Sequence, residues 1–208
     1  MIDKAGTGER TYLAIKTYLL AESDVRPGER VDIGDLSRRF GASASPVRAA
    51  LHRLAGERLV VSHQGEGFSL PRVTEPGLSD LYQWNAALLA NALRAAPRPP
   101  PTKVPDSDPS DNPVAQLERL FAVLAAQSDN VEVEWAVAGV SDRLYRARRA
   151  EIELVPDFAD EVAALRGELQ SGDAAAMRQM IVSYHRRRLR LVPAIVRRLH
   201  GLGDRIPR

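Results

Sequence analysis

Residues 45–54 carry side chains whose types and spacing suit contact with duplex DNA. In a helix, polar or small residues gather on one side of this segment: Ser45, Arg48, Ala49 and His52. Apolar residues gather on the other side: Val47, Leu51 and Leu54. A recognition helix needs this division, because its apolar back packs on other helices while its front enters the major groove. We therefore predict that Arg48 bonds guanine edges or phosphate, that Ser45 bonds phosphate, and that His52 does either.

The elements that position this segment follow from spacing and turn residues. Apolar residues at helical spacing predict helices over 7–22 and 33–40, and Arg38 and Arg39 on the second could approach the DNA backbone. Ser43 or Ser45 can cap a third helix that runs to about Gly56. Two short apolar segments, 59–61 and 68–70, flank a glycine-rich turn and predict a β-hairpin. Periodicity alone leaves another interpretation open, the exposed face of any three-helix unit.

The ordered string over 15–70 resembles the N-terminal domain of the GntR family of regulators. PGER follows the first helix, and SASPVRAALHRL matches the family pattern S-x-T-P-V-R-x-A-L-x-R-L. Leu36-Ser37 with Phe40-Gly41 matches the second helix, and the glycines of the hairpin match the wing. The resemblance covers about residues 11–73 and implies a winged helix-turn-helix. The residues expected to contact DNA are Ser43, Ser45, Arg48, His52, Arg38, Arg39, Gly65 and Gly67.

Two positions depart from that family pattern. The family usually has arginine after the first serine of the recognition helix, where this chain has Ala44. The wing tip often carries arginine or lysine, where this chain has Glu66. The resemblance implies that both positions contact DNA, so we expect a lower affinity and a changed sequence preference. Each lost phosphate contact should reduce the salt dependence of binding by about one unit of slope.

The rest of the chain is helical in pattern. Helices are expected over 76–96, 114–127, 131–153, 158–170 and 173–200, with a kink at Pro193. A proline-rich stretch, 97–113, should be an exposed, partly mobile connector. The predicted fold class is mostly α, with an N-terminal winged helix-turn-helix over 1–75 and a C-terminal antiparallel helical bundle over 76–208. The second domain is similar to the effector domain of the FCD subgroup of that family, through DLYQWNAALLANAL, LFAVLAAQSDN and LQSGDAAAMRQMIVSYH.

Members of that subgroup often hold a divalent metal on one acidic residue and three histidines. The resemblance places Glu118 at the acidic position and His185 at the last histidine. The first histidine position falls on Ala122 and the middle one near Val162. Because such metals need at least three protein ligands, we predict that no metal is bound and that no cofactor is needed. The other interpretations are a solvated Glu118 and a His185 that is simply a polar residue ahead of Arg186–Arg188.

A small-molecule effector would then need other anchors, with carboxylic acids as the first candidates. A bundle pocket should be mostly apolar with a few polar groups. The candidate pocket residues are Trp84, Asn85, Trp135, Arg143, Tyr145, Tyr184 and His185. Each of them is also explained as ordinary core or surface. The basic run 185–190 is interpreted as a charged solvent face that alternates with Leu189, Leu191 and Val192, rather than as a second nucleic-acid patch.

Composition limits the classes of function. The chain of 208 residues has no cysteine, which excludes disulfides, cysteine-ligated zinc and a cysteine nucleophile. No apolar run is long enough to span a membrane and the first residues lack a signal-peptide core, so a cytoplasmic protein is expected. The formal net charge is only +2, so a DNA-binding face depends on where the charges lie. We predict a homodimeric regulator, in the first instance a repressor, that binds an operator. An enzyme is not expected, because no catalytic string is present, and the alternative is a dimeric interaction scaffold with weak or lost operator binding.

Overall fold

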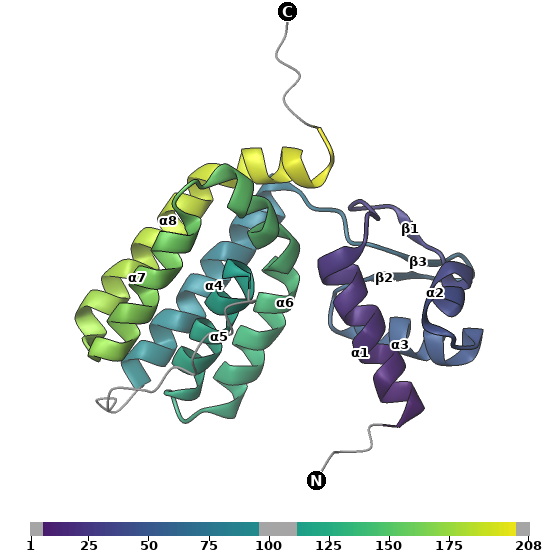
Figure 1. Cartoon of the computed structure of the whole chain (residues 1–208), viewed down its shortest axis with the longest axis horizontal. Helices are drawn as coiled ribbons and strands as arrows, with labels where there is room; N and C mark the ends of the chain where they lie inside the picture. Colours follow the sequence, from purple (N-terminus) through teal and green to yellow (C-terminus); the bar gives the residue numbers. More distant parts are fainter. Residues whose placement is uncertain (1–5, 96–111, 203–208) are drawn as a thin grey trace, which may run out of the picture. The chain divides into compact units, whose positions relative to one another are not determined.

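The computed structural model describes residues 6–95 and 112–202 (Figure 1). The chain divides into two compact units. The first contains residues up to 73 together with 199–202, and the second contains residues 74–198. From the sequence we predicted the domain boundary between residues 75 and 76. We call the first the winged-helix unit and the second the helical unit.

The winged-helix unit begins with three helical segments. They are α1 (Thr7–Thr17), which continues as the π-helical turn η1 (Tyr18–Glu22), α2 (Ile33–Phe40) and α3 (Ala44–Gly56). The predicted first helix over 7–22 is therefore present, but its last turn is wider, and the Ser23 N–H donates to the Tyr18 carbonyl at 2.9 Å. Asp32 caps α2, because its Oδ1 accepts from the backbone N–H groups of Gly34 and Asp35. Gly41 ends α2 with φ +59, which a side chain would disfavour.

The serine expected to cap α3 occupies the cap position without making the bond. Ser43 directly precedes α3 in an extended conformation, and its side chain accepts no hydrogen bond from the helix. Ser45 lies inside the first turn and is exposed. The hydroxyl of Ser43 is thus left available to another partner.

A small antiparallel sheet completes the winged-helix unit. Its strands are β1 (Arg30–Val31), β2 (Val61–His63) and β3 (Gly67–Ser69), in the order β1-β3-β2. The hairpin was predicted with its first apolar segment over 59–61, but β2 begins at Val61, and Leu59 and Val60 before it are buried in the core. β1 was not predicted, since two residues are too few to show an alternating pattern. The turn of the hairpin places Gly65 at φ +75 and Gly67 at φ +91.

The core of the winged-helix unit is apolar. Its central members are Tyr12, Ile15, Val47, Leu51, Leu54 and Phe68. The side chains that α3 contributes to this core are those predicted for its back. Packing of α3 on α1 therefore fixes which side of α3 faces outward.

The helical unit contains five helices in the described part of the chain. They are α4 (Glu75–Ala95), α5 (Pro113–Ala126), α6 (Val131–Leu154), α7 (Phe158–Ser171) and α8 (Ala174–Leu199). The predicted helix ends agree with these to within one residue. Of the predicted connector over 97–113, residues 97–111 lie outside the described residues, while Asn112 caps α5 and Pro113 opens it.

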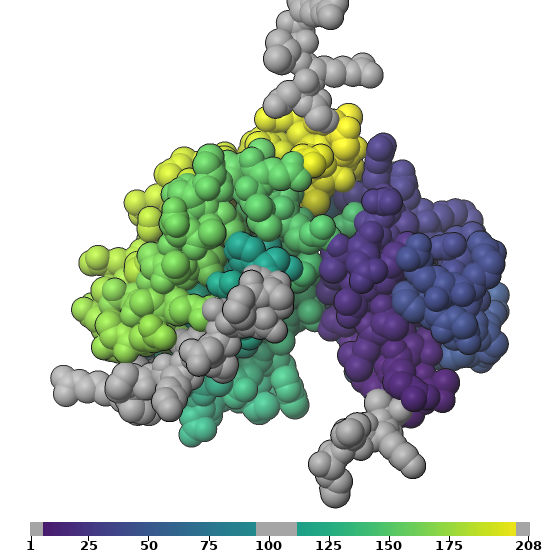
Figure 2. Space-filling view, viewed as in Figure 1, coloured from purple at the N-terminus to yellow at the C-terminus, as the bar shows by residue number. Residues whose placement is uncertain are grey.

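Contacts fix the directions of the first helices of the bundle. Asn85 on α4 and Glu118 on α5 lie at one level, because both bond to Arg148 on α6. Leu93 and Leu124, later in α4 and α5, line one cavity. α4 and α5 therefore run parallel, and α6, which follows α5 through a short turn, runs antiparallel to both. Figure 2 shows one face of the helical unit as closely packed atoms, with parts of α6, α7 and α8 at its surface.

α8 continues through Pro193 as one helix. Its ribbon changes direction in the last turns, near the proline where a kink was predicted (Figure 1). Within residues 6–95 and 112–202, no helix has both the length and the apolar character that a membrane span requires.

Candidate nucleic-acid interface and interior polar cluster

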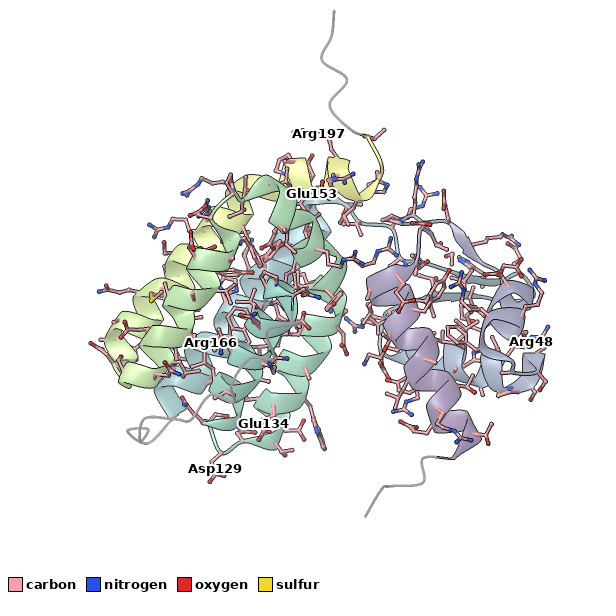
Figure 3. All side chains as sticks on the ribbon, in the orientation of Figure 1. Arg48, Asp129, Glu134, Glu153, Arg166 and Arg197 are labelled. Carbon is pink, nitrogen blue, oxygen red and sulfur yellow. The ribbon has the colours of Figure 1, made fainter. Side chains whose placement is uncertain are left out.

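The outward side of α3 carries the side chains predicted to bind DNA. Ser45, Arg48 and His52 are exposed. The opposite side is closed, since Val47, Leu51 and Leu54 have no accessible surface. Figure 3 shows Arg48 on the outer face of the winged-helix unit. The predicted division of this helix is thus present in the fold, with a guanidinium at the centre of the open face.

Arg48 differs from the two arginines of α2. Arg38 pairs with Asp35 at 3.5 Å, and Arg39 lies over the Tyr18 ring at 4.4 Å. Among the described residues, the Arg48 guanidinium has neither a hydrogen-bond partner nor an ion-pair partner. Arg48 therefore meets an incoming anion without first breaking an internal contact.

His52 is less free than its position on α3 predicted. Its ring contacts the Phe68 ring edge-on, with centroids 4.9 Å apart. Phe68 belongs to β3, so this contact ties the open face of α3 to the wing. The nearby His63 is held differently, since its Nε2 lies 2.8 Å from the Ser69 hydroxyl.

The wing tip contains a cation that sequence reasoning missed. Arg30 on β1 donates from Nη2 to the Glu66 carboxylate and from Nη1 to the Glu66 carbonyl, both at 3.1 Å. The unfavourable anion predicted at the wing tip is therefore paired with a guanidinium. The signal was absent from the sequence because Arg30 and Glu66 meet only through the pairing of β1 with β3. Both side chains are exposed, which makes the pair weak and easily exchanged for a phosphate.

The helical unit holds charged groups in its interior. The residues that make up this interior cluster are Tyr82, Asn85, Glu118, Ser141, Arg148, Glu151, Glu161, Tyr184, His185 and Arg188. Arg148, Glu151 and Arg188 have no accessible surface at all. Because an unpaired buried charge is costly, such groups persist only with close partners.

Glu151 is the centre of one half of the cluster. Its carboxylate accepts from Tyr82, from Tyr184 at 3.3 Å and from Arg188 Nε at 2.8 Å. Arg188 also donates to Glu161 and lies over the Tyr184 ring at 3.8 Å. Burial and the Glu151 charge raise the pKa values of both Tyr82 and Tyr184, so the two phenols remain donors.

Arg148 is the centre of the other half. It donates to Glu118 at 3.0 Å, to Ser141 at 3.2 Å and to Asn85 Oδ1 at 3.2 Å. His185 lies beside the same amide, with its Nε2 2.9 Å from Asn85 Oδ1 and its Nδ1 2.7 Å from the Ile181 carbonyl. Burial lowers the pKa of His185 to about 4, so the ring is neutral near pH 7.

A neutral His185 cannot satisfy both of its contacts. Each ring nitrogen faces a carbonyl oxygen, and a neutral ring carries only one N–H. In the interior cluster, three buried donors also have no hydrogen-bond partner among the described residues: Asn85 Nδ2, Arg148 Nε and Arg188 Nη2. The interior cluster is therefore closely held but not fully satisfied: His185 faces one acceptor more than it can bond, whereas these three N–H groups have no acceptor in the described part of the chain.

The predicted effector residues do not form one pocket. Asn85, Tyr184 and His185 meet in the interior cluster. Trp84 is 52% exposed and Trp135 is 65% exposed, so neither faces the interior. Arg143 and Tyr145 are half-buried on α6. A cavity of about 400 Å³ lies elsewhere, lined by Leu93, Leu124, Gln127, Glu168, Leu169, Gly172, Asp173, Ala174, Ala175 and Met177.

The residues at the expected metal positions do not fit a divalent metal. Glu118 is occupied by Arg148, and His185 lies against Asn85. Ala122 is exposed and Val162 is a buried aliphatic residue, so neither supplies a ligand. In the described part of the chain, no three His, Cys, Asp or Glu residues come together to hold a metal ion.

The structure also changes the interpretation of the basic run 185–190. It was predicted to be a solvent face, but Arg188 is fully buried and Arg187 pairs with Asp157. A signal was present in the spacing of α8, because residue 188 falls on the same stripe as Ile181, Tyr184 and Val192. Only Arg186 and Arg190 of the run's arginines are exposed.

The winged-helix unit matches a known family. The family described as "Bacterial regulatory proteins, gntR family" matches residues 7–70. The Nta operon transcriptional regulator of Aminobacter aminovorans is 39% identical over 72 residues, which are 34% of each chain. The uncharacterized HTH-type transcriptional regulator YdhC of Bacillus subtilis (strain 168) is 33% identical over 58 residues, which are 28% of this chain and 26% of that protein. The chain thus spans about a third or less of the curated relatives it matches.

Solved structures share the fold over nearly the whole chain. McbR/YncC of E. coli superposes with a TM-score of 0.64, at 14% identity, over 91% of this chain and 98% of that one. A putative transcriptional regulator GntR from Rhodococcus sp. RHA1 gives a TM-score of 0.69, at 16% identity, over 90% of this chain and 97% of that one. These similarities extend the shared architecture to the helical unit.

Proposed function

We propose that this chain, whose residues 7–70 form a GntR-family winged-helix domain, is a DNA-binding transcriptional regulator. The observation that carries the proposal is the geometry of α3. Its apolar back is buried, and its front presents an unpaired Arg48 between exposed Ser45 and His52. Arginine in the major groove bonds guanine edges or phosphates, which suits this face to an operator. A repressor that occupies its operator is the simplest form of this activity.

We propose that the active form is a homodimer. A single copy of the chain, whose formal net charge is only +2, would bind DNA weakly by itself. Two α3 helices placed about 34 Å apart would read the two halves of a palindromic operator. Analytical ultracentrifugation tests this point, and a monomer at the concentrations that bind DNA would contradict it.

We propose that a small molecule bound by the helical unit alters DNA binding through a population shift. Unpartnered N–H donors on Asn85, Arg148 and Arg188 favour a ligand with acceptor groups, such as a carboxylic acid. The cavity lined by Glu168 and Asp173 favours a ligand with a cationic group instead. A thermal-shift panel of carboxylic acids and amines distinguishes the two, because only the class that binds the folded protein raises Tm.

Arg48→Ala provides the direct test of DNA binding. Loss of a base or phosphate contact of this kind costs about 1–3 kcal/mol, which corresponds to a roughly 5- to 150-fold weaker Kd. Fluorescence anisotropy should be measured with a duplex from the promoter of the protein's own gene, at several salt concentrations. A phosphate contact also reduces the salt slope by about one, whereas a base contact leaves the slope unchanged.

Arg10→Ala is the matched control for this experiment. It removes an exposed arginine from α1, which packs on α3 from the side opposite its open face. We expect its Kd to stay within about twofold of the wild type, because removal of an exposed charge far from bound DNA changes little. Equal losses in Arg10→Ala and Arg48→Ala would show that only the total charge matters, and the α3 interface would then be wrong.

Ala44 and Glu66 favour a second candidate, a dimeric interaction scaffold with weak or lost operator binding. Both positions lack the cation expected at a DNA interface. The Arg30–Glu66 pair weakens this argument, since it returns a cation to the wing tip. A folded dimer that ignores the promoter duplex even at low salt would favour the scaffold over the regulator.

A further inference from the structure

The two guanidinium groups in the interior of the helical unit need an explanation beyond packing. Arg148 and Arg188 have no accessible surface, and their carboxylate partners come from three different helices: α5, α6 and α7. Removing a charge from water costs several kcal/mol even when the protein relaxes around it. A bundle of this size could fill the same space with leucine. We therefore expect each buried guanidinium to neutralise a negative charge in the same interior.

That charge comes from carboxylates directed into the bundle. Glu151 is fully buried, and the side chains of Glu118 and Glu161 are only 20% and 19% exposed. Arg188 lies between Glu151 and Glu161. Arg148 binds Glu118 at 3.0 Å and, through Asn85, is linked to His185. The carboxylate and the imidazole that could have ligated a metal are thus both organised around one guanidinium.

We propose that Arg148 is the built-in interior cation of the helical unit and takes the structural place of a divalent metal. The Glu118 carboxylate forms an ion pair with the guanidinium, and the Asn85 side-chain oxygen bridges the guanidinium and His185. The domain consequently folds without metal, and its stability does not respond to metal or chelator. This inference concerns the helical unit alone and does not depend on DNA binding.

The unsatisfied atoms of the cluster agree with this role. The partnerless groups on Asn85, Arg148 and Arg188 are all N–H donors, and two of them belong to cations. A divalent metal among them would be repelled by both guanidiniums, since like charges in a low-dielectric interior interact strongly. Water or an anion would be accepted. The interior is therefore chemically suited to acceptors and unsuited to a further cation.

The wild-type protein supplies the first test. After treatment with EDTA and dialysis, Tm should be unchanged, and addition of Zn²⁺, Ni²⁺ or Mn²⁺ should leave it within about 1 °C. Elemental analysis should find no stoichiometric metal. A metal that binds the folded state tightly would raise Tm by several degrees. Such a rise, together with one metal ion per chain, would overturn the proposal whether or not the protein binds DNA.

Substitution of Arg148 supplies the second test. Arg148→Met keeps much of the side-chain volume and removes the charge, which takes the guanidinium away from the Glu118 carboxylate and should lower Tm strongly. Combining it with Glu118→Gln removes both charges, so the double variant should recover part of the loss. If the losses of Arg148→Met and Glu118→Gln simply add, the guanidinium does not serve Glu118 and the proposal fails.

Arg166→Met is the matched control. Arg166 on α7 is half-buried and donates to the neutral Gln116 amide at 3.3 Å (Figure 3). Its replacement removes a cation from the same unit without exposing a buried carboxylate. A Tm loss in Arg166→Met as large as in Arg148→Met would mean that any arginine of the bundle is equivalent, which contradicts a specific interior cation.

Discussion

The two units of this chain differ in what they keep away from water. In the winged-helix unit the core is apolar, and ion pairs such as Lys16–Glu57 and Arg53–Glu9 stay at the partly exposed surface. In the helical unit, the buried set includes two arginines, a glutamate and a histidine. An apolar core requires the right pattern and volume, whereas a charged core also requires each partner at hydrogen-bond distance. The helical unit should therefore be far less tolerant of single charge changes.

The largest predicted effect comes from removing one charge of the helical core. Glu151→Gln leaves Arg188 with only Glu161 and weakens the bonds from Tyr82 and Tyr184. We expect a loss of about 3–5 kcal/mol, the range for breaking a buried ion pair. Both tryptophans of the chain, Trp84 and Trp135, lie in this unit, so urea unfolding followed by tryptophan fluorescence measures it directly.

Glu153→Gln is the control for that experiment. Glu153 lies two residues away on the same helix and pairs with Arg198 at 2.6 Å, but both side chains are about half exposed. An exposed pair contributes about 1 kcal/mol or less. Equal losses at positions 151 and 153 would remove the distinction between a charged core and a charged surface.

The next effect tests the apolar core of the winged-helix unit. Leu54 has no accessible surface, and Leu54→Ala should cost about 2–5 kcal/mol through lost burial and the cavity left behind. In urea unfolding followed by circular dichroism, the winged-helix unit of Leu54→Ala should unfold at a lower urea concentration than that of the wild type. Where the two units unfold independently, the tryptophan signal of the helical unit should not move. A parallel shift of that signal would instead show that the two cores form one cooperative system.

This difference also explains what sequence analysis could predict. The helix ends and the buried side of α3 followed from apolar periodicity, because an apolar residue on the apolar stripe of a helix is expected to be buried. The stripes of α6 and α8 also contain charged residues: Arg148, Glu151 and Arg188. From the sequence, a charged residue at such a position is equally well explained as buried or as the exposed edge of the stripe. Only the position of the ion-pair partners on other helices shows that these residues are buried. The same limit hid Arg30, whose partner Glu66 lies 36 residues away.

A smaller effect concerns the helix caps that orient α3. Asp32 accepts two backbone N–H bonds at the start of α2, and Asp32→Ala should cost about 1 kcal/mol. Ser43 occupies the same position before α3 without a side-chain bond, so Ser43→Ala should change stability by less than about 0.5 kcal/mol. Urea unfolding followed by circular dichroism measures both. If Ser43→Ala is the more damaging change, its hydroxyl caps α3 in solution.

The smallest effect sharpens the comparison within the helical unit itself. Arg187, next to the buried Arg188, instead pairs with the exposed Asp157. That pair lowers the pKa of Asp157 to about 2, from 3.8 in the unfolded chain. Because the folded pKa is the lower one, the stabilisation is complete above about pH 4 and disappears as the pH falls toward 2.

Asp157→Asn should therefore differ slightly from the wild type at pH 5 and no longer differ near pH 2. Arg187→Gln should remove the same pH-dependent increment, since either partner is enough to break the pair. The measurement is the free energy of unfolding in urea across this pH range for all three proteins. An increment that survives in Arg187→Gln would assign the depressed pKa of Asp157 to its own backbone rather than to the guanidinium. The contrast between buried and exposed arginines on α8 would then rest on Arg188 alone.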